Sequence, residues 1–136
     1  MFHVITEEYY SSIVGGVKNR SGFVAHNASR DIKDVLIAYD EGVAVGCAAF
    51  KKHSESDAEI KRVWVQPDYR GKHIASELMR HIEDRMRGVG FKRAILQTRE
   101  IMKDAVRLYE KLGYLRIECY PPYDELEGAV CFAKYL

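Results

Sequence analysis

Short apolar runs, separated by turn-forming residues, dominate the first half of the chain. Residues 35–39 and 43–50 are rich in valine and alanine, and Asp40-Glu41-Gly42 lies between them. Two such runs joined by a short segment ending in glycine are typical of a β-hairpin. The polar residues 51–57 then predict the next turn. The pattern therefore begins with two antiparallel strands.

A third strand is predicted over residues 58–65, where the character of the side chains alternates. One face would carry Ile60, Arg62 and Trp64. The other face would carry Glu59, Lys61, Val63 and Val65. Proline cannot donate a hydrogen bond to a sheet, so we expect this strand to end before Pro67.

A long helix is predicted next, because apolar residues recur with a spacing of four. The residues of this stripe are Ile74, Leu78, Ile82 and Met86, with Ala75 and Met79 beside them. Gly88 and Gly90 are expected to end the helix, since glycine readily adopts the left-handed backbone found at helix C-termini.

The second half of the chain predicts another strand, another helix and two closing strands. Residues 92–98 predict a short strand in which Ala94-Ile95-Leu96 is buried, and residues 103–112 have helical spacing up to Gly113. Residues 114–119 and 129–136 predict two closing strands around a loop that contains prolines.

The predicted order is β-β-β-α-β-α-β-β after a helical or irregular start, and residues 6–33 hold no clear period. Strands joined by helices imply parallel pairing, whereas hairpins imply antiparallel pairing. We therefore expect an α/β (α+β) fold with a mixed central sheet flanked by helices. A length of 136 residues fits a single domain, residues 1–136.

Composition narrows the class of protein. Hydrophobic residues make up 47% of the chain and charged residues 30%, as in an ordinary globular domain. A net charge of +1 argues against a general nucleic-acid binder. Residues 51–93 carry eleven basic and seven acidic groups, an excess that suits a smaller polyanion such as a phosphorylated cofactor.

The spacing of cysteine and histidine argues against a metal site. Cys47, Cys119 and Cys131 form no CxxC pair, and the five histidines show no ligand spacing. Reduced thiols in a cytoplasmic protein are the simpler interpretation. No apolar run is long enough to span a membrane, and residues 1–6 lack the layout of a signal peptide. We expect no membrane partner.

The most informative segment is residues 63–75, where a strand passes into a helix. The first turn of a helix presents backbone N–H groups without intrahelical partners, at the positive end of the helix dipole. This geometry binds anions, Gly71 leaves room for close approach, and Arg70 and Lys72 add positive charge. An ordinary turn with solvated basic residues is the competing interpretation of so short a motif.

Three motifs in the same order favour the first interpretation. Arg70-Gly71-Lys72-His73-Ile74-Ala75 resembles the Arg/Gln-x-x-Gly-x-Gly/Ala loop of the GNAT superfamily of N-acetyltransferases. Residues 59–65 are similar to the strand before that loop. Residues 105–114, with Tyr109 and Gly113-Tyr114, are similar to a later family motif. The resemblance covers about residues 34–136.

The resemblance implies a mostly antiparallel sheet with a parallel, splayed centre, and acetyl-CoA as co-substrate. The cofactor-binding residues that it implies are Val63, Trp64, Val65, Arg70, Gly71, Lys72, His73, Ile74, Ala75 and Tyr109. His73 departs from the family, because it replaces the central glycine of the loop. Met102 stands where many relatives carry Asn or Gln, and Arg99 where related sequences often have glycine.

The resemblance also implies catalytic roles. Tyr109 would protonate the departing CoA thiolate, although a half-buried structural tyrosine is the alternative. Glu59 would deprotonate the amine through water, although a solvated glutamate paired with Lys61 is equally compatible with the sequence. A backbone N–H of residues 63–65 would bind the oxyanion. The other carboxylates left open as the base are Glu100, Glu118 and Asp124.

We therefore expect an N-acetyltransferase that passes an acetyl group directly to a primary amine of a small molecule or peptide. A non-catalytic acyl-CoA sensor or partner module is the alternative, because of His73 and Met102. An RNA-binding module is disfavoured, since aromatic sheet-face motifs are missing. Tyr120-Pro121-Pro122-Tyr123 would wall the acceptor pocket, and an exposed C-terminal strand would allow a homodimer.

Overall fold

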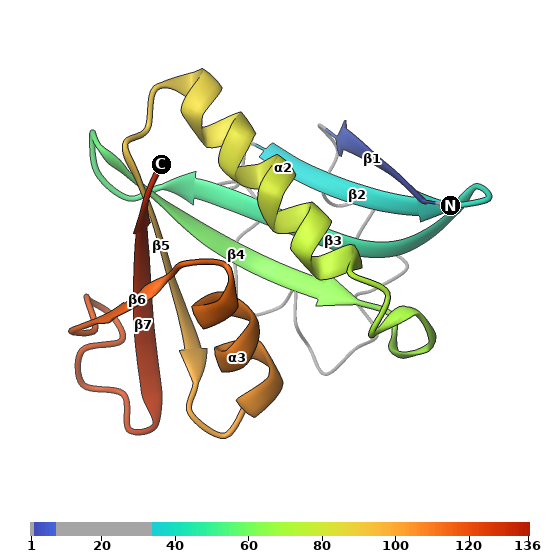
Figure 1. Ribbon diagram of the computed structural model, residues 1–136. Coiled ribbons are helices and arrows are strands. Elements are labelled where there is room, and N and C mark those ends of the chain that lie inside the picture. The colour runs from blue at the N-terminus through green and yellow to red at the C-terminus, as the bar shows by residue number, and fades with distance from the viewer. Residues whose placement is uncertain (1, 8–33) are drawn as a thin grey trace. The chain divides into compact units, whose positions relative to one another are not determined.

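The computed structural model describes residues 2–7 and 34–136, which form seven strands and two α-helices (Figure 1). The first four strands are β1 (Phe2–Glu7), β2 (Asp34–Asp40), β3 (Val43–Lys52) and β4 (Asp57–Val65). A 3-10 helix, η2 (Pro67–Tyr69), leads to α2 (Ile74–Val89). The remaining elements are β5 (Arg93–Arg99), α3 (Lys103–Lys111), β6 (Leu115–Ile117) and β7 (Ala129–Tyr135).

The strands follow the order β1-β2-β3-β4-β5-β7-β6 in the sheet. Strand β4 pairs with β5 in parallel, and Asp57–Glu59 face Arg93–Ile95 in register. Strand β2 pairs with β1 and β3, and β7 pairs with β5 and β6, all antiparallel. The predicted mixed, mostly antiparallel sheet with a parallel pair is confirmed.

The start of the chain corrects one prediction. Residues 2–7 form strand β1, paired antiparallel with β2, where a helical or irregular start was expected. Val4, Ile5 and Thr6 are β-branched residues, which fit a pleated strand once a partner strand is available. That partner begins more than thirty residues later in the chain, at Asp34. The unassigned residues 8–33 lie outside the described part of the structure.

The predicted hairpin between β2 and β3 is confirmed. Glu41 and Gly42 form its two-residue turn, with φ angles of +50° and +82°. Two consecutive left-handed residues give the backbone twist that tight hairpins favour. The register Asp40↔Val43 closes the turn.

Helix α2 shows where the predicted helix end was right and where it was wrong. The helix continues through Gly88 and ends after Val89. Gly90 takes φ +104°, and its N–H donates to the Met86 carbonyl at 3.1 Å. Only Gly90 therefore acts as the stop, because a glycine within a helix lowers stability without breaking the hydrogen-bond ladder.

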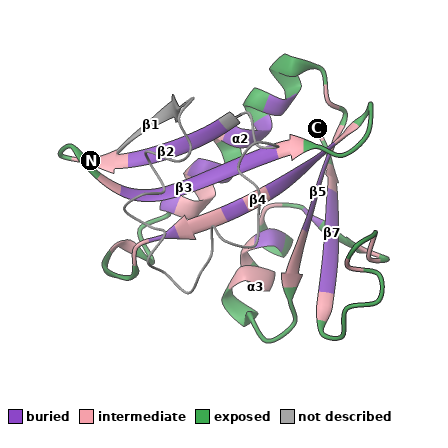
Figure 2. Ribbon diagram, turned by 180° about the vertical axis from the view of Figure 1, so that it is seen from behind, coloured by how far each residue is buried: buried purple, intermediate pink, exposed green. Residues whose placement is uncertain are grey.

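The chain divides into two compact units, each described by itself. The first comprises residues 1–51 and 61–82, and the second comprises residues 52–60 and 83–136. Figure 2 shows buried residues along the middle of β2, β3, β4 and β7. The predicted apolar stripe of α2 is buried, with Ile74, Leu78, Ile82 and Met86 each at most 3% exposed.

Candidate active site

The segment between β4 and α2, residues 66–73, is called the β4–α2 loop here. Its first residue is anchored on β3, because the Gln66 N–H donates to Val45 O at 2.8 Å. The Gln66 side-chain amide also donates to Ala44 O at 3.0 Å. A tight turn follows, in which Tyr69 N–H bonds Gln66 O at 2.9 Å. The strand therefore delivers the chain to this loop at a fixed position.

Arg70 holds the β4–α2 loop through its own side chain. Its Nε donates to the carbonyl oxygen of Val65, the last residue of β4, at 2.9 Å. The sequence predicted Arg70 as a source of positive charge toward a phosphorylated ligand. The structure shows that Arg70 also has a structural role, because its side chain links the loop to the last residue of β4.

The backbone of the β4–α2 loop explains the departure at His73. Gly71 takes φ +81° and His73 takes φ +63°, and both lie in the left-handed region. Glycine adopts this region without cost, whereas a residue with a Cβ pays roughly 1–2 kcal/mol. A glycine, which the resemblance predicted at this position, would take this backbone without cost, whereas His73 adopts it under strain.

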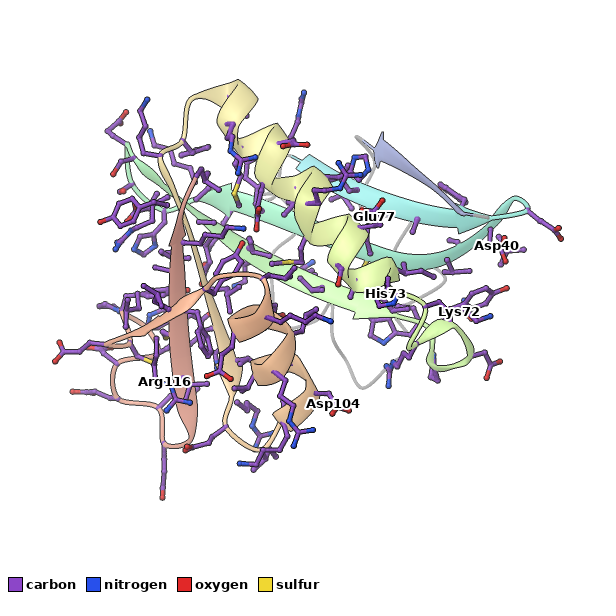
Figure 3. All side chains as sticks on the ribbon, in the orientation of Figure 1. Asp40, Lys72, His73, Glu77, Asp104 and Arg116 are labelled. Carbon is purple, nitrogen blue, oxygen red and sulfur yellow. The ribbon has the colours of Figure 1, made fainter. Side chains whose placement is uncertain are left out.

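The first turn of α2 presents unpaired donors to the loop. The first intrahelical acceptor is His73 O, which the Glu77 N–H reaches at 3.1 Å. The preceding N–H groups of Ile74, Ala75 and Ser76 therefore point out of the helix start, where a phosphate binds well. Figure 3 shows Lys72 and His73 where the chain enters α2, with Glu77 one turn further along.

Lys72 brings positive charge to the same place. It is exposed, and its ammonium group lies 5.2 Å from the centre of the Tyr69 ring. The aromatic ring attracts the cation and restrains the long side chain beside the loop. The residues of the β4–α2 loop and the helix start thus fit a pyrophosphate group by backbone donors, positive charge and open space at Gly71.

Strand β4 carries the other predicted cofactor residues of the first unit. Trp64 packs against the buried cluster of Val35, Ile37, Cys47 and Ala49. Val65 lies near Gly46 of β3, where an added Cβ would meet Val65 Cγ2 at 3.3 Å and Trp64 O at 3.0 Å. Gly46 was missed from the sequence, although a glycine inside a strand signals close backbone approach.

Arg62 breaks the strict alternation predicted for β4. It has φ +59° and is buried, and Lys61 and Val63 on either side are half-buried. A left-handed residue inside a strand is the conformation of a bulge, which redirects the side chains that follow it. The Cys47 thiol donates to the carbonyl oxygen of Arg62 at 3.3 Å, so the bulge is held from β3.

The second unit contains Tyr109, on α3. Tyr109 is 8% exposed. Its ring makes an edge contact with the Tyr114 ring and a tilted contact with the Phe132 ring, and both pairs of ring centroids are 6.1 Å apart. Burial raises the pKa of Tyr109 to about 12. No described residue forms a hydrogen bond with its hydroxyl group, so this proton donor is available to a ligand.

Tyr114 differs from Tyr109, because its hydroxyl is already in use. It donates to the Glu83 carboxylate at 2.7 Å, and Lys134 donates to the other oxygen of that carboxylate at 3.0 Å. Burial and then the Glu83 charge raise the pKa of Tyr114. This network joins the end of α2 to β7, and sequence reasoning missed it.

Glu59, also in the second unit, is not the solvated glutamate that the sequence left open. It is 4% exposed, and the Tyr120 hydroxyl donates to its Oε2 atom at 2.9 Å. Burial and then the Glu59 charge raise the pKa of Tyr120. The three other candidate carboxylates, Glu100, Glu118 and Asp124, are all exposed. The structure therefore singles out Glu59 as the shielded carboxylate among the four.

Two further aromatic rings pack against Tyr120, and an ion pair lies two residues before Glu59. The Tyr120 ring makes edge contacts with His53 at 5.0 Å and with Tyr123 at 5.6 Å. Asp57, two residues before Glu59, receives two hydrogen bonds from Arg93, at 3.1 and 2.7 Å. These bonds hold the pKa of Asp57 below its usual value. They fix the start of β4 against β5.

The pairing register places Glu59 and Tyr109 on opposite faces of the sheet in this unit. Glu59 pairs with Ile95, whereas Tyr109 contacts Phe132, which pairs with Leu96. Because neighbouring residues of a strand point to opposite faces, Ile95 and Leu96 separate the two sides. A base on one face and an acid on the other suit an acceptor and a leaving group that approach from opposite sides.

Two further findings concern the described residues alone. None of their helices is both long and apolar enough to cross a membrane. They contain no group of three or more His, Cys, Asp or Glu side chains able to hold a metal ion. That the protein is cytoplasmic and that it binds no metal both stay predictions.

Comparison with known proteins assigns the family. The model of the acetyltransferase (GNAT) family matches residues 3–114. An IAA acetyltransferase from Azospirillum brasilense is 35% identical over 97 residues, covering 71% of this chain and 63% of that protein. A mycothiol acetyltransferase from Corynebacterium efficiens is 36% identical over 92 residues, covering 68% and 31%. The chain thus spans less than two thirds of these relatives.

Solved structures share the fold. A GNAT family acetyltransferase from Elizabethkingia anophelis, solved with acetyl-CoA bound, matches with a TM-score of 0.82 at 12% identity, covering 99% of this chain and 98% of that one. The IAA acetyltransferase from Bacillus cereus matches with a TM-score of 0.80 at 17% identity, covering 98% and 100%. With the family match over residues 3–114, this chain belongs to the GNAT family of acetyltransferases.

Proposed function

We propose that the protein is an acetyl-CoA-dependent N-acetyltransferase that passes the acetyl group directly to a primary amine. The observation that carries the proposal is the buried Tyr109, whose hydroxyl forms no hydrogen bond with any described residue while the nearby Tyr114 hydroxyl is bound to Glu83. A buried tyrosine whose hydroxyl no described residue engages is suited to donate a proton to a ligand. Family membership supplies the reaction that needs one.

The β4–α2 loop would bind the pyrophosphate of acetyl-CoA. The N–H groups of Ile74, Ala75 and Ser76 would donate to it, and Lys72 would add positive charge. The left-handed backbone at Gly71 and His73 leads directly into these donors and would set their direction. Val63, Trp64 and Val65 would contact the remainder of the cofactor from β4, and a backbone N–H of this segment would bind the oxyanion.

Glu59 would accept a proton from the acceptor, because an ammonium group cannot attack a thioester until it is neutral. The Tyr120 hydroxyl orients the Glu59 carboxylate through the 2.9 Å hydrogen bond. Acetyl-CoA supplies an activated acyl group on a thiol that leaves. Tyr109 would donate its proton to that sulfur, which burial favours by keeping the hydroxyl protonated, with a pKa of about 12.

The acceptor is proposed to be a small-molecule or peptide amine, handled by one domain over residues 1–136. The Tyr120 ring, which carries the partner hydroxyl of Glu59, and the rings of His53 and Tyr123 packed against it would contact the acceptor. The C-terminal strand β7 was expected to be exposed, and this was wrong, because β5 and β6 pair with it on its two sides. The edge strand is β6, where Leu115 is 74% exposed, and a homodimer through β6 is part of the same proposal.

The test is acetyl transfer to a panel of small amines and short peptides, followed by the mass of the acetylated product. We expect at least one acceptor to gain one acetyl group for each CoA released. Thermal stabilisation by acetyl-CoA, measured in parallel, separates the competing function. Stabilisation without product from any acceptor would identify an acyl-CoA sensor and overturn the enzymatic proposal.

A further inference from the structure

The edge of the sheet in the second unit is strand β6 (Leu115–Ile117). Among the strands that the structure describes, β6 is the last in the order and pairs only with β7. After Ile117 the chain continues without a turn or bend as far as Tyr120. The outer side of an edge strand presents backbone N–H and C=O groups that another strand can pair with, and Leu115 is 74% exposed there.

The side chains of this edge segment, residues 115–119, alternate in character. The segment reads Leu-Arg-Ile-Glu-Cys. Arg116 and Glu118 are exposed, and neither forms an ion pair with a described residue. Arg116 lies 5.9 Å from the centre of the Phe132 ring, which it faces in β7. Because an extended chain alternates, Glu118 shares the face of Arg116, and the other three residues of the segment lie on the opposite face.

A second copy of the chain could pair with this edge through a two-fold axis. Two identical edges then form one interface in which each copy contributes the same surface. An axis normal to the sheet makes the two β6 strands antiparallel and keeps both faces of the sheet continuous. Directly opposed residues of an antiparallel pair point to the same face, so the axis passes through a residue and not between two residues.

The charges of the edge segment select one position for this axis. An axis at Ile117 places Arg116 opposite Glu118 of the second copy, and symmetry repeats this pair once. An axis at Arg116 or at Glu118 places two like charges directly opposite each other, which destabilises a sheet. An axis at Leu115 leaves both charges without an opposite charge across the interface. The sequence of the edge is therefore complementary to itself about Ile117.

We propose that residues 115–119 form the contact surface for a second copy of this chain, paired antiparallel about Ile117. Ile117 then lies opposite its own copy, and Leu115 lies opposite Cys119 of the second copy. So short a contact gives a small interface, so we expect a reversible equilibrium between monomer and dimer. This pairing rests on the homodimer named with the proposed function, but it does not require acetyl transfer.

The first test reverses the charges and measures association of the full chain by analytical ultracentrifugation, without acetyl-CoA. Arg116→Glu should raise the dissociation constant of the dimer at least about tenfold, because both attractive pairs become repulsive. Glu118→Arg should have the same effect. The double variant restores opposite charges with their positions exchanged, and its dissociation constant should lie within about threefold of the wild type. Glu125→Arg, at an exposed residue outside the segment, is the matched control and should leave association unchanged.

The second test measures the register by cross-linking in a Cys119→Ser background. Ile117→Cys places two cysteines directly opposite each other, with Cα atoms about 4.5–5.5 Å apart, a separation that a disulfide spans. Mild oxidation should therefore yield a covalent dimer. Leu115→Cys is the control, since Leu115 is more exposed but would lie roughly 13 Å along the strand from its own copy. This control should stay uncross-linked.

The outcomes separate the pairing from the enzymatic activity. A chain that stays monomeric at millimolar concentration, or a dimer that Arg116→Glu and Glu118→Arg leave unchanged, would overturn the proposed surface. A double variant as weak as the single ones, or a cross-link through Leu115→Cys in place of Ile117→Cys, would overturn the register. A monomer that acetylates amines removes the pairing and leaves the acetyl transfer standing, whereas a dimer without acetylated product does the reverse.

Discussion

The β4–α2 loop and the surroundings of Tyr109 and Glu59 are built on different principles. The role proposed for the loop rests on its backbone, with left-handed residues at Gly71 and His73 and N–H groups without intrahelical partners at the start of α2. In the second unit the proposed catalytic groups are the buried side chains of Tyr109 and Glu59, and the Tyr120 hydroxyl holds the Glu59 carboxylate. A backbone site tolerates changes of side chain, whereas a side-chain site depends on single atoms.

This difference explains where the sequence departs from its family. His73 stands in place of a family glycine in the loop, at φ +63°. The backbone keeps its conformation there, at the expense of strain, and the N–H groups beyond it stay in place. The roles proposed for Tyr109 and Glu59, in contrast, depend on individual side-chain oxygen atoms.

The largest effect is expected from two tyrosines that differ by one contact. Tyr109→Phe should lower turnover roughly 10²- to 10⁴-fold, the range for a general acid, with little change in unfolding free energy. Tyr114→Phe, the matched control, removes the 2.7 Å bond to Glu83 and should cost about 1–3 kcal/mol of stability with turnover retained. Steady-state rates and urea unfolding measure both. Equal losses of turnover would show that Tyr109 is structural.

The backbone site is tested by charge and bulk at its centre. Gly71→Asp introduces a side chain at φ +81° and places a negative charge beside the proposed pyrophosphate. Acetyl-CoA at about 100 times its dissociation constant should stabilise the wild-type fold by ~2.7 kcal/mol, and this gain should vanish in the variant. Thermal unfolding with and without acetyl-CoA provides the measurement. Undiminished stabilisation would place the cofactor elsewhere.

The buried tyrosine also predicts a loss of stability at high pH. Tyr109 ionises near pH 10 when unfolded and at about 12 when folded, because burial penalises the charged form. The unfolded chain therefore loses its proton first, and the contribution is present below pH 10 and lost as pH rises toward 12. The unfolding free energy of the wild type should fall by roughly 1–3 kcal/mol more than that of Tyr109→Phe over this range. Parallel curves would contradict the burial of the hydroxyl.

The smallest effect is expected at His73. His73→Gly relieves a left-handed residue that carries a Cβ, which should raise the unfolding free energy by about 1 kcal/mol. Affinity for acetyl-CoA should stay similar or improve, because the proposal assigns the binding to backbone N–H groups. Calorimetric titration and urea unfolding decide the matter. A loss of affinity greater than about tenfold would mean that the imidazole itself contacts the cofactor.

Local chemistry made much of the fold predictable. The Glu41-Gly42 turn and the apolar stripe of α2 are properties of short stretches of chain. Strand β1 was missed, since its pairing with β2 depends on residues far along the sequence. The prediction that Gly88 helps to end α2 was wrong, because a helix stabilised by its buried face tolerates one glycine.

The candidate site shows the same division. The β4–α2 loop is continuous in sequence, so its position and charge were predicted, although the left-handed backbone of His73 was not. The partner of Glu59 is Tyr120, which lies 61 residues away. Tyr114, likewise, bonds Glu83 from 31 residues away. Sequence patterns give no direct sign of such partners, because tertiary packing alone brings them together.

The most direct test of the account is the dependence of turnover on the acidity of the leaving thiol. A series of acetyl thioesters would be compared in the wild type, Tyr109→Phe and Glu59→Gln. If Tyr109 protonates the leaving sulfur, its loss should steepen this dependence, because less acidic thiols need the proton most. Glu59→Gln should lower every rate without changing the slope. Equal slopes in the wild type and Tyr109→Phe, at undiminished rates, would contradict the proposed role of Tyr109.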